Sequence, residues 1–267
     1  MTTKLAFNVE PSNRRYRLRL ARYRALAETV ADFIKNGAGK TIILDVGVGS
    51  GRTLRYLEPT GMSERADFYG LDIDSKRLYG IYGKKRWRLV MADVTKGIPF
   101  KDESVDVAII EQVLEHIPNP EDALKEMARV LKPGGLLIVG VPIFPAPVEW
   151  VRKKVTAYAA KRFGVTRGHV QTFTLKKTTG LMEKTGLFDI SSVNGFRIAS
   201  GGILGPLEDL RFWWRLNAFI GKIVPSLCTE IQVTAKKRFP TFPKGLGSRC
   251  AKPLQREAEG FGKQHGD

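Results

Sequence analysis

A glycine-rich turn is the first feature of this sequence whose residue types and spacing could do chemistry. The stretch Asp45-Val-Gly-Val-Gly-Ser-Gly51 follows an apolar, β-branched run and places Gly47, Gly49 and Gly51 at alternate positions. Without side chains, such a turn lets a ligand lie against the backbone near the positive end of a following helix. The spacing differs from the GxGxxG of a dinucleotide pyrophosphate site. The turn therefore predicts a small-molecule site of another kind.

Two carboxylates, Asp72 and Asp93, end the next two apolar runs along the chain. Asp72 lies in Gly70-Leu-Asp-Ile-Asp74 and Asp93 in Met91-Ala-Asp-Val94. A carboxylate at the position of Asp72 can accept hydrogen bonds from both hydroxyls of a ribose. A carboxylate at the position of Asp93 can accept a hydrogen bond from an exocyclic amino group. Each could instead cap its own strand end, and Asp45 could tie down its own turn while it also contacts a ligand.

A sheet is needed to bring these residues together. Apolar and β-branched runs predict five strands, at 41–46, 68–73, 88–92, 105–110 and 136–141. Apolar residues at steps of three and four predict an amphipathic helix over about 13–36, and a second helix fits 121–131. This alternation predicts an α/β fold with a doubly wound, mostly parallel sheet, whose ligand lies at the carboxyl ends of the strands.

The ordered motifs resemble those of the class I S-adenosylmethionine-dependent methyltransferases, in the broad group similar to the ubiquinone-biosynthesis methyltransferases. The resemblance covers about residues 40–142 and includes LDVGVGSG, GLDID, MADV, an IPF and SVDV pair, LEHI and LKPGGLLIVGVP. It implies a Rossmann-like sheet of seven strands, with an N-terminal helix and a helical cap insertion before the last strand.

The same resemblance implies how S-adenosylmethionine would be bound. The turn from Asp45 to Gly51 would hold its methionine end, Asp72 its ribose, and Asp93 with Val94 its adenine. Glu111 and the segment 114–117 would border the sulfonium. The predicted cofactor-binding residues are Asp45, Gly47, Gly49, Gly51, Asp72, Ile73, Asp93 and Val94.

Methyl transfer mainly needs an acceptor atom held in line with the methyl group. An oxygen or acidic carbon acceptor would gain from a base, for which Glu111, His116 and His169 are the candidates. His116 could equally pack a helix, and His169 could hydrogen-bond a loop carbonyl. The sequence has no Asn-Pro-Pro-Tyr segment after the predicted strand 105–110, and no proline-cysteine pair after that strand or after the predicted strand 136–141. We therefore expect transfer to O, C or a simple N atom, without a metal.

The positive charge of the chain lies outside the predicted cofactor half. Of the net charge of +17, residues 41–150 carry −2, whereas 1–40 carry +6, 151–235 carry +8 and 236–267 carry +5. The segment 211–222 combines Arg211, Arg215 and Lys222 with Trp213, Trp214, Phe219 and Ile220. Such a surface would suit an anionic membrane or RNA. In the alternative interpretation the aromatic residues pack on the sheet and the charges are merely solvated.

The domain prediction is a basic helical segment at 1–40, a methyltransferase domain at 41–238 with its cap at about 198–229, and a basic, disordered tail at 239–267. Two cysteines and the lack of any apolar run of about 18 residues predict a cytosolic protein without a membrane span, with contact to a membrane surface only. The favoured acceptor is a small or lipid-like molecule. The alternatives are an RNA methyltransferase, a cofactor-binding partner protein without activity, and a nicotinamide oxidoreductase.

Overall fold

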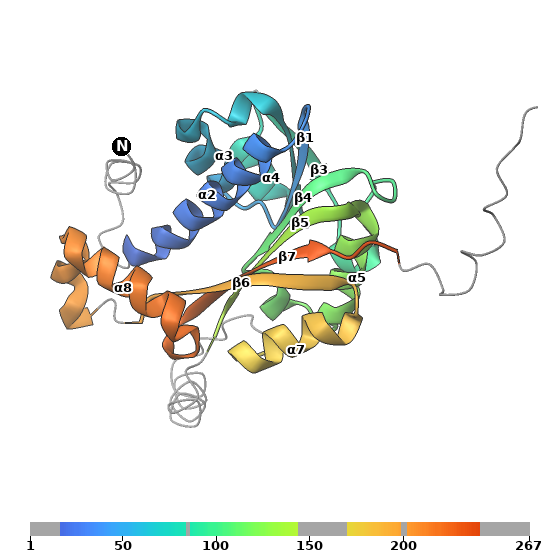
Figure 1. Ribbon diagram of the computed structural model, residues 1–267. Helices are drawn as coiled ribbons and strands as arrows, with labels where there is room; N and C mark the ends of the chain where they lie inside the picture. The colour runs from blue at the N-terminus through green and yellow to red at the C-terminus, as the bar shows by residue number, and fades with distance from the viewer. Residues whose placement is uncertain (1–16, 84–85, 144–169, 199–201, 241–267) are drawn as a thin grey trace, which may run out of the picture.

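A seven-stranded sheet runs through the centre of the protein (Figure 1). The computed structural model describes residues 17–83, 86–143, 170–198 and 202–240. The strand order is β3-β2-β1-β4-β5-β7-β6; β1 to β5 are parallel, and β7 is antiparallel to both of its neighbours. The strands are β1 (Thr41–Val46), β2 (Ala66–Asp72), β3 (Trp87–Met91), β4 (Val105–Glu111), β5 (Leu131–Pro142), β6 (Phe188–Phe196) and β7 (Glu230–Lys237). The predicted doubly wound, mostly parallel sheet is confirmed.

Helices cover both faces of this sheet, and two apolar cores lie between them and the strands. One core contains the buried side of α2 together with α3 and α4, and the other contains α5 and α7. The α-helices are α2 (Ala21–Asn36), α3 (Arg52–Leu57), α4 (Ser75–Ile81), α5 (Pro120–Val130), α7 (Leu175–Thr185) and α8 (Arg211–Ile223). The short 3-10 helices are η1 (Arg17–Leu20), η2 (Glu58–Thr60), η3 (Ser63–Arg65), η4 (Val94–Lys96), η5 (Leu114–His116), η7 (Gly202–Asp209) and η8 (Pro225–Leu227).

The fifth strand begins five residues earlier than its apolar run predicts. Leu131 already pairs with Val105, and the register then shifts before Leu136 pairs with Val107. Gly134 has a φ of +75°, and a Cβ at Gly135 would meet the Lys132 carbonyl oxygen at 2.8 Å. The Lys-Pro-Gly-Gly segment therefore lies within β5, because its glycines permit an irregular strand between the predicted helix at 121–131 and the predicted strand at 136–141.

The cap lies between β6 and β7, as expected, but α8 does not bury all four residues that the alternative interpretation packs on the sheet. Asn217 and Gly221 are its buried residues, whereas Phe219 is 63% exposed. Trp213 and Trp214 are half-buried. The interpretation in which Phe219 packs on the sheet is wrong. The reason is that Gly221, having no side chain, lets the α8 backbone approach Gly195 of β6 too closely for any Cβ.

Parts of the predicted organisation lie outside the described residues. These are the first residues of the helix expected over 13–36, most of the tail expected over 239–267, and His169. Within the described N-terminal part, η1 precedes α2, which ends at Asn36 as predicted. No helix in the described ranges combines the length and the apolar character that crossing a membrane requires.

Candidate active site

The glycine turn follows β1, where the strand order of the sheet reverses, because β1 pairs with β2 on one side and with β4 on the other. The backbone N–H groups of Gly47 and Val48 both donate to the carbonyl of Leu71, at 2.7 and 3.1 Å. A Cβ at Gly47 would collide with Val113, whereas one at Gly49 would meet only a backbone oxygen at 3.7 Å. Gly47 is therefore required by packing, and the turn is open at Gly49.

Asp72 connects the end of β2 to this turn. Its Oδ2 accepts from the Gly49 N–H at 3.3 Å, and its Oδ1 accepts from the Asp74 N–H at 3.0 Å. The side chain is 3% exposed, and Arg77 lies 3.8 Å from Oδ2. Asp74 itself caps α4 by accepting from the Lys76 N–H. The structure thus brings together two motifs that are more than twenty residues apart in the chain.

Asp45 is the most enclosed carboxyl of the turn. Its side chain is 3% exposed and forms a hydrogen bond with Thr53 of α3. The pKa of Asp45 is raised to about 7, mainly by burial; the hydrogen bond with Thr53 lowers it, and the negative charges of Glu111 and Asp72 raise it. A cation placed beside Asp45 would reverse this effect, because it would favour the ionised carboxylate.

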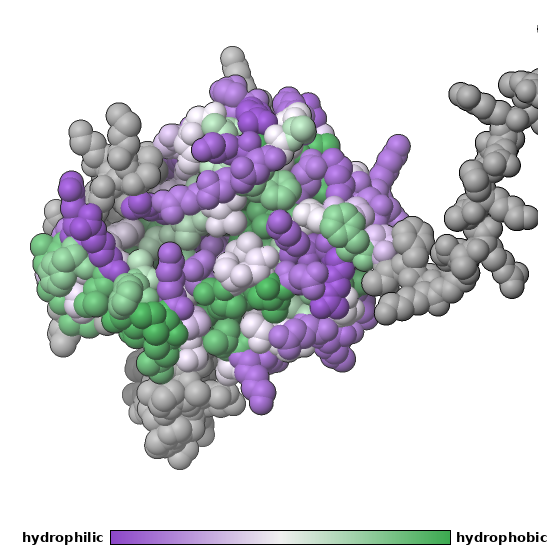
Figure 2. Space-filling model, viewed as in Figure 1, coloured by the Kyte–Doolittle hydropathy of each residue, from purple (hydrophilic) through white to green (hydrophobic). Residues whose placement is uncertain are grey.

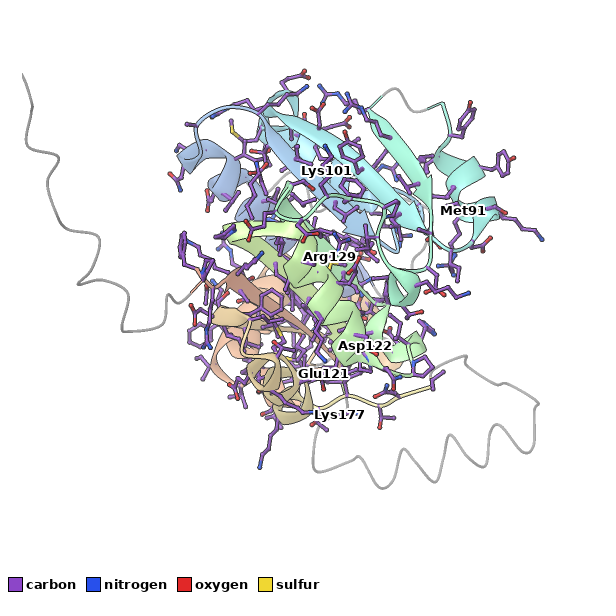
Figure 3. The ribbon with its side chains drawn as sticks, turned by 90° about the vertical axis from the view of Figure 1, so that its right-hand side faces the viewer. Met91, Lys101, Glu121, Asp122, Arg129 and Lys177 are labelled. Carbon is purple, nitrogen blue, oxygen red and sulfur yellow. The ribbon has the colours of Figure 1, made fainter. Side chains whose placement is uncertain are left out.

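The end of β3 carries the third carboxylate. Asp93 caps η4, where it accepts from the N–H of Thr95 at 2.9 Å and from its hydroxyl at 2.7 Å, and these bonds lower its pKa. Val94 is buried in the core, so only its backbone could contact a ligand. Ile73 and Met91 are 69% and 68% exposed, and Figure 3 shows Met91 well apart from the labelled residues of α5 and α7. Carboxylate and apolar surface thus adjoin at this edge.

Glu111 ends β4 but is enclosed in a cluster of buried ions. Arg22 of α2 lies 3.3 Å from its Oε2, and Gln232 of β7 donates to its Oε1 at 2.6 Å. Arg22 also pairs with Glu230 at 3.0 Å, and Arg197 pairs with Glu230 at 2.7 Å. Burial raises the pKa of Glu111, and the Arg22 charge opposes that rise. We refer to these five residues as the Arg22 cluster.

The remaining predicted bases are placed differently. His116 is exposed on η5, and His169 lies outside the described residues. Another candidate base, Glu115, lies between Glu111 and the next α-helix, and it is 1% exposed. Burial raises the pKa of Glu115 to about 7, and within the described residues its Oε2 has no hydrogen-bond partner.

Sequence reasoning missed both Glu115 and Arg22. Glu115 belongs to the segment 114–117 that the motifs singled out, but the sequence pointed to the neighbouring His116 as the candidate base. Arg22 precedes Leu26 and Val30 by four and eight residues, so helical spacing alone places it on the buried face of α2.

The segment that begins at Val170 is hydrogen-bonded to η5. The N–H groups of Val170 and Gln171 both donate to the Glu115 carbonyl, at 2.9 and 3.1 Å. The Gln171 side chain donates to the carbonyls of Ile117 and Pro118 at 2.8 and 2.5 Å. Glu121, Asp122 and Lys177, which are labelled in Figure 3, line a hollow beside it. In the described part of the chain, no three His, Cys, Asp or Glu residues could hold a metal ion.

Comparisons with known proteins agree with this geometry. A family model described as a methyltransferase domain matches residues 44–139. A protein of Mycobacterium sp. (strain JLS), named only as an uncharacterized methyltransferase, is 29% identical over 217 residues, which cover 74% of this chain and 81% of that protein.

Two solved structures have a similar fold. One is the CurJ carbon methyltransferase, with a TM-score of 0.59 at 13% identity, covering 84% of this chain and 56% of that one. The other is a SAM-dependent methyltransferase from Aquifex aeolicus, with a TM-score of 0.51 at 17% identity, covering 88% and 98%. Residues 44–139 thus match a methyltransferase domain, a relative that matches 74% of this chain is named a methyltransferase, and the sheet has the Rossmann-like fold of solved S-adenosylmethionine-dependent methyltransferases.

Proposed function

We propose that the chain binds S-adenosylmethionine at the carboxyl ends of β1, β2 and β3 and transfers its methyl group to an O, C or N atom of a small or lipid-like acceptor. The observation that carries the proposal is Asp72, which is hydrogen-bonded to the open glycine at position 49 while it ends the neighbouring strand. A ligand that lies on this turn would meet both the turn backbone and the carboxylate.

Three further features support this cofactor. The buried Asp45 offers a negative charge to the cationic methionine end, next to the turn. Asp93 at the end of β3 offers an acceptor to the adenine amino group, and the exposed side chain of Ile73 offers apolar surface to the ring. Asp72 would exchange or share its present backbone hydrogen bonds with the ribose hydroxyls.

The sulfonium of the cofactor supplies a methyl group on a good leaving group, so the protein mainly has to orient the acceptor and exclude water. Glu115 is suited to take a proton from an oxygen or carbon acceptor, because a carboxyl with a pKa near 7 is partly ionised at neutral pH. Glu111 is less suited, because its carboxylate already pairs with Arg22 and Gln232.

A groove between α2 and α8 supports an amphipathic acceptor. It measures about 550 Å³ and opens beside Phe196, the last residue of β6. Because β6 runs parallel to β5, its carboxyl end lies at the same edge of the sheet as the glycine turn. The groove combines Trp214 and Phe196 with Arg24 and Arg211, which suits a molecule with an apolar body and an anionic or polar end.

The cofactor assignment is tested by titration calorimetry with S-adenosylmethionine and S-adenosylhomocysteine. Asp72→Ala should weaken both ligands by about 1.5 to 3 kcal/mol, because charge-assisted hydrogen bonds are lost. Asp74→Ala is the matched control: it removes the α4 cap, at a cost of about 1 kcal/mol in stability, but should leave the affinity unchanged. Unaltered affinity in a folded Asp72→Ala protein would refute the assignment.

RNA methylation is a second candidate, which the net charge of +17 favours. Incubation with methyl-labelled cofactor, followed by separate extraction of lipids, small molecules and RNA, distinguishes the acceptors. Label in RNA alone would favour the second candidate. Tight cofactor binding with no label in any fraction would favour a binding partner without activity.

A further inference from the structure

Helix α8 presents its apolar side to solvent. Phe212, Leu216, Phe219 and Ile223 are 58%, 40%, 63% and 62% exposed. Their spacing of four, three and four residues places them on one side of the helix, and we call them the apolar stripe. Figure 2 shows apolar surface that follows α8 along its length. Scattered exposed apolar residues need no explanation, but a continuous stripe on one helix does.

The opposite side of α8 is fixed against the protein. Gly221 lies against the backbone of Gly195, where no Cβ could fit, and Asn217 is buried beside it. The indole N–H of Trp214 donates to the Glu208 carbonyl at 2.7 Å, and the Glu208 carboxylate accepts from the Leu18 N–H at 3.0 Å. These contacts hold the helix in an orientation that keeps the apolar stripe outward.

A row of cations runs beside the apolar stripe. Arg211, Arg215 and Lys222 share a second side of α8, and all three are exposed. The helix contains no acidic residue. The basic row lines the groove opposite α2, whose Arg24 adds a cation and whose Glu28 and Asp32 add two acidic groups. Four cations therefore face two carboxylates there, and the surface beside the apolar stripe remains positive.

We propose that α8 docks the enzyme on the surface of an anionic phospholipid bilayer. The apolar stripe enters the boundary between headgroups and acyl chains, and the basic row lies at the level of the phosphates. A helix of 13 residues is too short to span the hydrocarbon core, which takes about 20, but its length suits a helix that lies in the plane of the interface.

Docking in this orientation has a consequence for the acceptor. The groove between α2 and α8 is lined by the basic row, so it would open at the membrane surface. An amphipathic acceptor could then enter it without leaving the interface for water. The docking itself does not rest on the methyl-transfer proposal, and its test needs neither cofactor nor acceptor.

The test is flotation of the full chain with vesicles at low salt. The protein should float with vesicles of phosphatidylcholine and phosphatidylglycerol in equal parts, and not with phosphatidylcholine alone. Phe212→Ser combined with Phe219→Ser should lower the bound fraction by about tenfold or more, because two large apolar side chains no longer insert. The matched control is Tyr79→Ser with Tyr82→Ser, which removes two rings that are 76% and 78% exposed, one on α4 and one directly after it, and which should float as the wild type does.

The same experiments would also show whether another partner, such as a second copy of the chain or RNA, binds the apolar stripe. The proposal is overturned if the protein ignores anionic vesicles, or if both double variants lose binding equally. It is also overturned if the protein forms a dimer that the Phe212 and Phe219 changes dissociate, or if RNA binds through the same residues while vesicles do not. Should the phenylalanine variant fail to fold, Phe219→Trp decides: lipids brominated on their acyl chains should quench the fluorescence that this variant gains over the wild type, and absence of that quenching refutes insertion.

Discussion

The structural role of Asp45 and the ligand-binding role that we propose for it are connected by its protonation. In the protein without ligand it anchors the turn to α3 through Thr53, and its burial keeps a proton on it up to about pH 7. A ligand cation would draw that proton off. The sequence predicted the position of this carboxyl next to the glycine turn, from which a carboxylate can bond locally and outward. Its raised pKa could not be predicted, since it depends on Glu111 and Asp72 coming close in the fold.

The stability of the protein should therefore depend on the ionisation of Asp45. Its pKa is raised from 3.8 to about 7 in the folded state, so the stabilisation is complete below about pH 4 and is lost as the pH rises through 7. Asp45→Asn should remove this loss. Between pH 5.5 and 8, the free energy of unfolding of the wild type should fall by about 2 kcal/mol more than that of the variant. Denaturant unfolding at the two pH values measures this, and parallel pH curves would count against the assignment.

Glu115 should act on turnover and not on cofactor affinity. Glu115→Gln keeps the shape of the side chain but cannot take a proton, so kcat should fall by roughly 10²-fold or more with unchanged calorimetric affinity for the cofactor. The wild-type rate should rise with pH through about 7, and the variant should lose that rise. His116→Ala, at the exposed neighbouring residue, is the control. If His116→Ala lowered kcat more than Glu115→Gln does, the histidine would be the base.

At the scale of elements, ordered motifs predict the strand ends well, because β-branched runs and terminal carboxylates are local signals. β1 begins and ends at the predicted residues, and β4 is longer by one residue. The orientation of α8 was not predictable in this way. It depends on Gly221 meeting Gly195 on a distant strand, and no local pattern reports that contact. The same holds for the Arg22 cluster, whose members come from α2, β4, β7 and the end of β6.

The Arg22 cluster should hold α2 on the sheet. Arg22→Met leaves Glu111 buried without its cation and Glu230 paired with Arg197 alone, which should lower the free energy of unfolding by about 3 to 5 kcal/mol. The loss should be smaller at pH 5 than at pH 8, because Glu111, whose pKa burial raises, takes up a proton more readily at the lower pH. Arg24→Met removes a more exposed arginine of the same helix, which pairs with Glu28 at the surface, and should cost less than about 1 kcal/mol. Equal losses would mean that helix packing alone holds α2.

Across the whole molecule, charge and chemistry are separated. The half that contains the glycine turn and the three carboxylates carries −2, and all of the positive excess lies in the segments before and after it. Composition alone gave that division. It could not show which cations share a surface with apolar side chains, because that depends on how α8 is turned on β6.

This separation predicts that salt should affect the two binding events differently. The carboxylates of Asp45 and Asp72 are 3% exposed, so added salt screens them little, and affinity for S-adenosylmethionine should change by no more than about twofold. Vesicle binding through Arg211, Arg215 and Lys222 should instead fall by about tenfold or more, because these cations are exposed and the screening length shrinks to about 3 Å at 1 M salt. Calorimetry and flotation on one preparation measure both. A parallel fall would mean that the overall charge of the protein governs both events, whereas salt-resistant vesicle binding that still needs Phe212 and Phe219 would mean that the apolar stripe docks without help from the basic row.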